Sequence, residues 1–260
     1  MTNQVHPTAI ISEQACLGSN NIIGANVQID ADVVIGNNNI IMTGTVLKSG
    51  LRMGDGNTVH EYSVLSGLPQ DIAFDQNTTS FVRIGNGNVF REYLTVHRAS
   101  QAEQVTLIGD NNYFMTQVHI AHDCEIANHV IIAPSTALGG FVTVEERAFI
   151  SGGVMIHQFV HIGAYAMLGG NAKITLDVLP YMIVDGNPAQ VNGLNKVGLR
   201  RAGFKLQEMK VLKAAYQLLF KTSYTLEEKI DRVLRLEHPL STHICDFIAR
   251  SKRGFHRDKG

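Results

Sequence analysis

The chain has 260 residues, of which 45% are hydrophobic and 17% are charged. This composition excludes a disordered chain, and the length allows a sizeable buried core. No apolar run approaches the roughly 18 to 20 residues of a membrane helix, and the first residues lack the basic start and apolar run of a signal peptide. We therefore expect a cytoplasmic protein without membrane insertion. Cys16, Cys124 and Cys245 are too far apart for a disulfide framework or a C-x-x-C metal site, and we expect buried thiols.

The net charge of -1 hides an uneven distribution. Residues 1–189 hold 7 Lys and Arg against 16 Asp and Glu, whereas residues 190–260 hold 15 against 7. The small total argues against nucleic acid as the main partner. The basic segment 190–221 is either a solvated helix face or a surface that meets an acidic partner or a phosphate. The charges of this segment are nearly all positive, whereas residues 1–189 carry a net negative charge, and this contrast favours the second interpretation.

An apolar residue recurs at every sixth position through most of the first 174 residues, for example at Ile23, Ile29 and Ile35 and again at Ile120, Ile126 and Ile132. This period fits neither a helix, near 3.6, nor a simple alternating strand, near 2. It fits short strands joined by tight corners and stacked into a solenoid. Hexapeptide repeats wind three faces per coil with left-handed crossovers, an exception to the usual handedness. The sequence predicts a left-handed parallel β-helix. The alternative, a β-sandwich, needs strands about 8 to 12 residues apart and hairpin signals.

The register is interrupted at 66–82 and 98–107, which we expect to leave the stack as loops that line a site. The repeat ends near Pro180, and Gly186-Asn187-Pro188 marks an exit from it. Apolar residues at helical spacing from Leu199 predict an amphipathic helix. A capping-box pattern at 225–228 predicts a second helix, extending through Leu236. The predicted organisation is a β-helix domain at 1–189 and a basic α-helical C-terminal domain at 190–260.

With three six-residue faces per coil, residues 18 apart lie above one another, about 4.7–4.8 Å apart. His122, Gly140 and Gln158 share one such column, and Asp123 begins the next. A neutral imidazole can act as a general base, and an adjacent carboxylate can fix its tautomer. The pair His122 and Asp123 is therefore the leading catalytic candidate, and a backbone N–H at Gly140 is placed to hold a developing oxyanion.

Other histidines gather near this column, and two of them have alternative interpretations. His119 ends the preceding face, and His157 comes one residue before Gln158. His97 joins them if the loop at 98–107 folds back; otherwise it is a surface corner. His119-x-x-His122 could also supply two zinc ligands, but the wider histidine spacing of hexapeptide metal enzymes is absent. We therefore expect no metal.

Several motifs together resemble one family. They are Val5-His6-Pro7-Thr8-Ala9-Ile10, Pro69-Gln70-Asp71, His119-Ile120-Ala121-His122-Asp123-Cys124, His157-Gln158-Phe159, Gly186-Asn187-Pro188 and Gly198-Leu199-Arg200-Arg201-Ala202-Gly203-Phe204. The chain is similar, nearly end to end, to the UDP-N-acetylglucosamine O-acyltransferases of lipid A biosynthesis. Members are homotrimers of left-handed β-helices with sites between subunits. They move an acyl chain from acyl carrier protein, a small acidic protein, to the sugar 3-hydroxyl of UDP-N-acetylglucosamine.

The resemblance implies a role for each matching residue. His122 is the general base, Asp123 orients it, and the Gly140 N–H holds the oxyanion. Gln70 and Asp71 contact the sugar, while further residues line the cleft: His97, His119, His157 and Gln158. Asn195 and Arg201 reach the phosphates of the nucleotide sugar or of the carrier's 4′-phosphopantetheine, and the basic helix docks the carrier. Gly170 matches the position that sets acyl length, where a small residue leaves room for a longer chain. No cofactor is bound by the chain itself.

The sequence departs from the family pattern at several positions. The family usually has histidine where Phe141 stands, lysine where Ala73 stands, an acidic residue where Val197 stands, and Arg-Gly-Thr where Arg98-Ala99-Ser100 stands. The base, its carboxylate and the oxyanion glycine are kept, so we expect acyl transfer to be intact. The alternatives are a paralogue acting on another sugar nucleotide such as a 3-amino sugar, an acetyl-CoA hexapeptide transferase, and a binding solenoid without activity.

Overall fold

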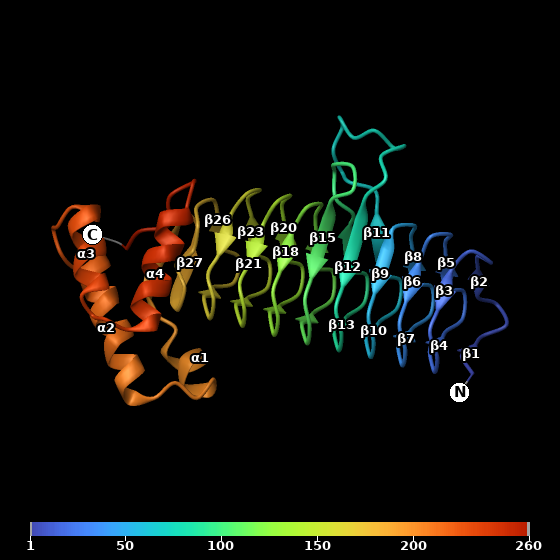
Figure 1. Cartoon of the computed structure of the whole chain (residues 1–260), viewed down its shortest axis with the longest axis horizontal. Helices are drawn as coiled ribbons and strands as arrows, with labels where there is room; N and C mark the ends of the chain where they lie inside the picture. The colour runs from blue at the N-terminus through green and yellow to red at the C-terminus, as the bar shows by residue number, and fades with distance from the viewer. Residues whose placement is uncertain (1, 259–260) are drawn as a thin grey trace.

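In the computed structural model, which describes residues 2–258, the chain forms a long triangular stack of short parallel strands that ends in a group of helices (Figure 1). From β1 to β26, each strand pairs with the strands three before and three after it in this series. The six-residue apolar series points inward, so that Ile23, Ile41 and Ile132 are 0–1% exposed. The predicted period of three faces per coil is confirmed.

Three sheets form the three faces of the stack. The first has 11 strands: β1 (Gln4–Val5), β4 (Ile22–Ile23), β7 (Ile40–Ile41), β10 (Thr58–Val59), β13 (Val89–Phe90), β16 (Tyr113–Phe114), β19 (Ile131–Ile132), β22 (Phe149–Ile150), β25 (Met167–Leu168), β27 (Met182–Gly186) and β28 (Ala189–Leu194). The second has 9: β2 (Ile10–Ile11), β5 (Gln28–Ile29), β8 (Val46–Leu47), β11 (Val64–Gly67), β14 (Thr95–His97), β17 (His119–Ile120), β20 (Ala137–Leu138), β23 (Met155–Ile156) and β26 (Lys173–Ile174). The third has 8: β3 (Cys16–Leu17), β6 (Val34–Ile35), β9 (Leu51–Met53), β12 (Phe81–Ile84), β15 (Val105–Ile108), β18 (Glu125–Ile126), β21 (Thr143–Val144) and β24 (His161–Ile162).

We number the corners by the sheets they join: the first corner leads from the first sheet to the second, the second corner from the second to the third, and the third corner back to the first. Nearly every regular corner contains one residue with φ near +60°, such as Asn20, Asp32 and Asn38. Asn and Asp tolerate this left-handed conformation better than most residues. Asn or Asp occupies this position at intervals of six from Asn20 to Asn38, whereas other residues, such as Tyr62 and Phe141, occupy it at many later corners.

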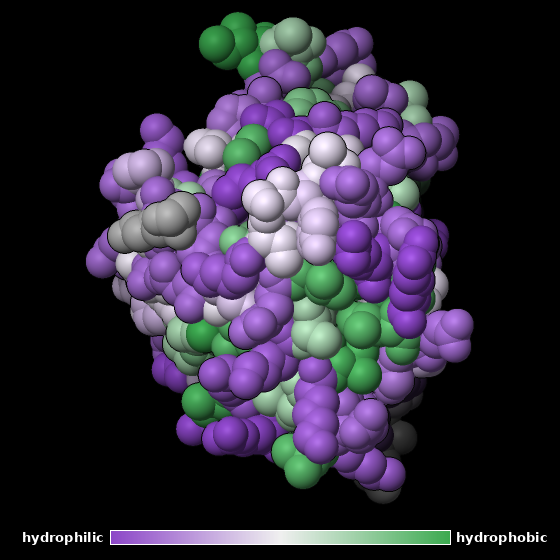
Figure 2. Space-filling view, turned by 90° about the vertical axis from the view of Figure 1, so that its left-hand side faces the viewer, coloured by the Kyte–Doolittle hydropathy of each residue, from purple (hydrophilic) through white to green (hydrophobic). Residues whose placement is uncertain are grey.

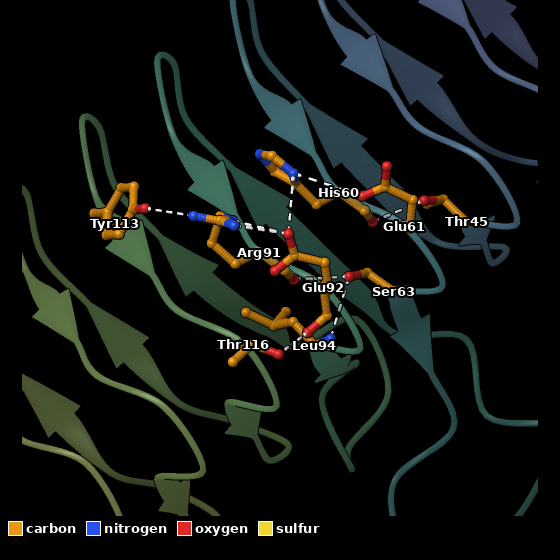
Figure 3. Close-up of polar contacts among 9 residues, drawn as sticks. All are labelled: Thr45, His60, Glu61, Ser63, Arg91, Glu92, Leu94, Tyr113 and Thr116. Carbon is orange, nitrogen blue, oxygen red and sulfur yellow. Dashed lines mark hydrogen bonds and ion pairs between the residues drawn. The ribbon is translucent and has the colours of Figure 1, made fainter.

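Buried polar side chains join the coils at the corners. At the third corner the amide of Asn39 donates to Oδ1 of Asn21 at 3.1 Å, and the next two amides continue the ladder through Asn57 and Asn88. At the first corner hydroxyls satisfy corner carbonyls, as where Ser63 donates to the Arg91 carbonyl at 3.0 Å (Figure 3). The same side chains also pair buried backbone groups that the two-residue strands leave over, as where the Asn39 N–H donates to Oδ1 of Asn21 at 2.9 Å.

Both register breaks leave from the second corner, in consecutive coils. One loop follows β11 and the other follows β14, and both project from the same edge of the stack (Figure 1). The strands extend further than the expected breaks: Gly67 pairs with His97, and Phe81 pairs with Val105. The loops therefore cover about 68–80 and 98–104. The stack resumes its register after each, because β10 still pairs with β13 across the first loop and β13 with β16 across the second.

The C-terminal part is helical. After β28, which pairs antiparallel with β27, come α1 (Lys196–Arg201), α2 (Leu206–Phe220), α3 (Leu226–Leu234) and α4 (Pro239–Arg250). The single helix expected from Leu199 is wrong, because Gly203, at φ +87°, ends α1 and α2 begins afterwards. The capping box of α3 is confirmed: the Thr225 hydroxyl accepts from the Glu228 N–H, and the Glu228 carboxylate accepts from the Thr225 N–H.

One half-buried carboxylate links this helical part to the stack. Glu145, after β21, lies 3.0 Å from Nε2 of His161 in β24 and 3.1 Å from Nε2 of His243 in α4. His243 is held in turn by the Tyr181 hydroxyl at 2.7 Å. The two histidines and an N–H donated by Ala164 hold the pKa of Glu145 well below its usual range, although burial acts in the opposite direction.

The surface of the helical end is mostly hydrophilic, with scattered apolar patches (Figure 2). Leu206, Leu226 and Leu234 are among its exposed apolar residues. Within residues 2–258 no helix is both long and apolar enough to cross a membrane. Of the three cysteines, Cys124 and Cys245 are buried as expected, but Cys16 is exposed because it precedes the inward-pointing Leu17 and faces outward.

Candidate active site

His122 and Asp123 lie at the second corner, directly after β17. Nδ1 of His122 is 2.7 Å from Oδ2 of Asp123, and the two side chains are 14% and 9% exposed. Because the carboxylate accepts from Nδ1, the lone pair of the neutral ring is on Nε2. Asp123 itself occupies the left-handed corner position, with φ 59°. The turn of the repeat thus places the two side chains against each other.

Two contacts fix the carboxylate side of this pair. The Asp123 N–H donates to the Thr106 hydroxyl at 2.7 Å, and the Ser100 N–H donates to Oδ2 of Asp123 at 3.0 Å. Thr106 is a buried residue of β15, and Ser100 belongs to the loop 98–104. Sequence reasoning missed both. The position of Thr106 in the coil preceding Asp123 could have indicated it, whereas nothing in a loop without a period indicates Ser100.

Gly140 lies directly over the imidazole. A Cβ built on Gly140 would be 2.5 Å from Cε1 of His122 and 2.8 Å from Nε2, so any larger residue would displace the ring. The Gly140 N–H donates no hydrogen bond within residues 2–258, as at several other corners. A free backbone donor therefore lies beside the ring nitrogen that can accept a proton, as stabilisation of an oxyanion requires.

Two adjoining cavities open at this corner. One, of about 410 Å³, is lined by Gln70, His119, His122, Gly140 and Gln158 over an apolar wall that includes Leu138 and Met155. The other, of about 480 Å³, shares three of these residues and adds Asp71, Ile72, Phe141 and Phe159. The predicted column of residues 18 apart is thus brought together with the long loop 68–80. Gln70 and Asp71 reach the site from that loop.

His97 and His119 complete the histidine cluster. Their rings meet edge to face with centroids 5.0 Å apart, and Nδ1 of His119 is 2.8 Å from the Thr95 hydroxyl. His97 is 8% exposed, and its Nδ1 has no hydrogen-bond partner within residues 2–258. Burial and, to a smaller extent, the charges of His119 and His122 lower the pKa of His97 to about 4; burial also lowers the pKa of His119. His97 therefore joins the cluster, and the surface-corner alternative is wrong.

Phe141 stands where the family usually has histidine. Its ring meets the His122 imidazole edge to face at 5.4 Å and stacks on Phe159 at 4.7 Å. The polar side of the cleft thus faces an apolar wall. Ala73 lies in the long loop, where its N–H donates to the Asp71 carboxylate at 2.9 Å.

The remaining predicted site residues line neither cavity of the single chain. His157 is exposed, with Nδ1 3.0 Å from the Gln158 carbonyl, and Gly170 lies at the first corner. Asn195 is buried as the N-cap of α1, where its side chain accepts from Gly198 and donates to the Tyr165 carbonyl. Arg201 is exposed at the end of α1. The structure thus divides the predicted residues into two groups.

The histidine pair considered as a zinc site, His119 and His122, belongs to no three-residue group of candidate ligands. Within residues 2–258 the group whose ligand atoms all lie within 4.8 Å is His60, Glu61 and Glu92, at the first corner. Its Glu92 oxygen is already bound by Arg91 at 2.7 Å (Figure 3). That cluster is explained by ion pairing alone, so it gives no support to a metal site.

Comparison with known proteins gives concordant results. Residues 177–256 match the model of the second domain of UDP-N-acetylglucosamine O-acyltransferase, and residues 106–140 match the bacterial transferase hexapeptide repeat. A curated acyl-(acyl-carrier-protein)–UDP-N-acetylglucosamine O-acyltransferase from Leptothrix cholodnii is 40% identical over 263 residues, covering 98% of this chain and 99% of the relative. One from Synechocystis is 41% identical over 200 residues, covering 76% of this chain and 72% of the relative.

Solved structures agree. The UDP-N-acetylglucosamine acyltransferase of Bacteroides fragilis superposes with a TM-score of 0.94 at 35% identity, covering 98% of this chain and all of that one. The enzyme of Francisella novicida gives 0.96 at 30% identity, covering 99% and 95%. The predicted fold, a left-handed parallel β-helix with a small helical C-terminal part, is confirmed. The chain is an acyltransferase that belongs to the family of acyl-(acyl-carrier-protein)–UDP-N-acetylglucosamine O-acyltransferases.

Proposed function

We propose that this chain transfers an acyl group from acyl carrier protein to the 3-hydroxyl of UDP-N-acetylglucosamine, the first step of lipid A biosynthesis, in the cytoplasm. One observation carries the assignment of the site: Nδ1 of His122 is bonded to Asp123 while Nε2 lies beneath Gly140 at the cleft. A base, the group that orients it and an oxyanion donor are therefore together at one corner.

In the proposed reaction, Nε2 of His122 takes the proton of the sugar hydroxyl while the oxygen attacks the thioester carbonyl carbon. The imidazolium is stabilised by Asp123. The carbonyl oxygen becomes an oxyanion that accepts from the Gly140 N–H. Collapse of this intermediate breaks the carbon–sulfur bond, and the leaving thiolate of the carrier's 4′-phosphopantetheine takes the proton from His122. The products are the sugar ester and the free carrier thiol.

Gln70 and Asp71 are proposed to bind the sugar, because both face the cavity next to His122. His97 and His119 stay neutral at neutral pH, because burial lowers their pKa values. They would therefore not compete with His122 for the proton of the sugar hydroxyl. His157 and Gln158 are proposed to contact substrate at the rim of the cleft.

The helical part is proposed to dock the acidic carrier. Its exposed basic residues Arg200, Lys210 and Lys213 form no ion pair within residues 2–258, so their charge is available. We further propose a homotrimer whose sites lie between subunits. The division of the predicted residues supports this, because Gly170 and the exposed Arg201 lie outside the cleft of their own chain and would be supplied by a second copy.

The first experiment measures acyl transfer by the purified protein from a panel of carrier thioesters to UDP-N-acetylglucosamine and to its 3-amino analogue, with product mass as the readout. We expect transfer to the hydroxyl sugar. Transfer to the amino analogue alone would identify a specialised acceptor, for which the Phe141 ring against His122 is the supporting observation. Transfer to neither, by a folded protein, would favour the binding solenoid.

A complementation experiment tests the shared site. His122→Ala and Arg201→Ala are each expected to be nearly inactive, whereas co-expressed mixed trimers regain activity at sites that combine two intact halves. A sedimentation mass of one chain, or mixtures no more active than their parents, would contradict the inter-subunit site.

A further inference from the structure

A separate cavity of about 290 Å³ lies on the same edge of the stack, on the N-terminal side of the candidate active site. It is lined by Asp30, Lys48, Ser49, Ser66, Leu68 and Arg98. Asp30, Lys48 and Ser49 come from the second corner of two successive coils and Ser66 from β11, whereas Leu68 and Arg98 begin the two loops. The cavity therefore has a rigid wall from the repeats and a second wall from the starts of both loops.

The charges lining this cavity do not balance. Lys48 lies 3.4 Å from Asp30, which also accepts from the Gln28 amide at 3.0 Å. The Arg98 side chain makes no ion pair and no hydrogen bond within residues 2–258, and its backbone N–H donates to the Gly67 carbonyl. Asp32, whose negative charge acts on Arg98, is already bound by Arg52. One cation of the cavity is thus left without a counter-charge.

The guanidinium of Arg98 is also partly removed from water. Its Nε is buried without a hydrogen-bond partner, and its charged carbon lies 5.8 Å from the ring centre of Phe74, in the long loop. Guanidinium groups remain charged in proteins. Burying such a group without an acceptor is unfavourable, and an anion with several oxygens would offset that penalty by accepting from its fork of donors.

We propose that this cavity binds a phosphate group, held by Arg98 and Lys48. A phosphate matches the planar donor fork of arginine, and the ammonium of Lys48 supplies a second positive charge. The two serine hydroxyls donate to the carbonyls of Ala31 and Ser49, so they shape the wall while the two cations bind the ligand. The volume admits a phosphate ester as well as free phosphate.

A phosphate bound in this cavity would affect the position of groups that contact His122 and Asp123. Arg98 comes two residues before Ser100, whose N–H donates to the Asp123 carboxylate. Leu68 likewise comes two residues before Gln70, which lines both cavities of the cleft. A phosphate bound by Arg98 would hold the starts of both loops against the stack, and with them the donor to Asp123.

Calorimetric titration of the purified full chain with inorganic phosphate and with UMP tests the inference without relying on turnover. Arg98→Gln and Lys48→Gln are each expected to weaken phosphate binding by roughly tenfold or more, the usual effect of losing a charged hydrogen bond. Lys48→Gln guards against a folding defect in the Arg98 variant. Arg83→Gln, an exposed arginine of β12 outside the cavity, is the matched control and should bind like wild type.

A competition arm identifies the source of the phosphate. If phosphate and UDP-N-acetylglucosamine exclude each other and both need Arg98, the cavity takes the phosphates of the nucleotide sugar. If both bind together, it holds a separate anion. Wild-type protein that binds neither phosphate nor UMP at millimolar concentration, or Arg98 and Lys48 variants that bind them unchanged, would overturn the inference. An enzyme that is active but binds no phosphate would overturn it while leaving the proposed function intact.

Discussion

Replacing Gly140 with alanine tests how closely the base is held. The new Cβ would lie 2.5 Å from Cε1 of His122, whereas ordinary contacts begin at 3.4 Å, so the ring must retreat by about 0.9 Å. A displacement of about 1 Å at a reacting group lowers the rate by about a hundredfold, which corresponds to about 2.7 kcal/mol in the barrier. Alanine keeps the backbone N–H that is proposed to bind the oxyanion. A lower rate in Gly140→Ala would therefore be caused by displacement of the His122 ring and not by loss of that donor.

The assay is kcat/KM for acyl transfer from a carrier thioester to UDP-N-acetylglucosamine, with urea unfolding as the test of folding. Gly152→Ala is the matched control at another corner, since its Cβ would lie 3.2 Å from the Pro134 carbonyl oxygen and needs a shift of only a few tenths of an ångström. We expect Gly152→Ala to keep most of the activity. A folded Gly140→Ala enzyme within about threefold of wild type would refute the steric reasoning.

Three further predictions follow from the described contacts. His122→Ala is expected to lower kcat by about 10²- to 10⁴-fold while leaving the unfolding midpoint nearly unchanged, and near-normal turnover would exclude it as the base. Glu145→Gln should weaken the contact between α4 and the stack and flatten the pH dependence of stability. Because the folded-state pKa of Glu145 is lowered, its stabilisation is present above the usual carboxyl pKa, about 4, and is lost as the pH falls below it; urea titrations at pH 7 and pH 3 on both proteins measure this. His97 should remain neutral down to about pH 5, because burial lowers its pKa to about 4, and imidazole NMR shifts that titrate near 6.5 would contradict its burial.

The six-residue period predicted the stack because one inward apolar residue per face is a physical requirement of a three-sided coil. The same arithmetic predicted that His122, Gly140 and Gln158 share an edge. It also specified that Asp123 follows at the corner, where the backbone turns its carboxylate toward the imidazole. These parts of the site could be read from spacing alone because the repeat is rigid.

Other parts of the site and of the fold were not predicted from the spacing of residues. Gln70 and Asp71 were identified through family resemblance, since the loop that carries them has no period. The Ser100 N–H and the burial of His97 depend on how the two loops pack, which no local pattern encodes. The helix α4 was missed although its spacing could have indicated it: Ile244, Phe247 and Ile248 lie at helical spacing and are buried, and the contact of His243 with Glu145 adds to their packing. The break at Gly203 was missed because apolar spacing continued across it.

Each coil adds about 4.8 Å along the axis of the stack. An inserted loop of any length leaves this spacing between successive coils unchanged. The 31 residues from Thr58 to Val89 advance the chain by one step, as do the 18 residues from Ile40 to Thr58. Positions along the edge therefore change only in whole steps. An enzyme of this architecture could acquire a longer reach between His122 and its helical end by duplicating one coil, without altering the geometry at either end.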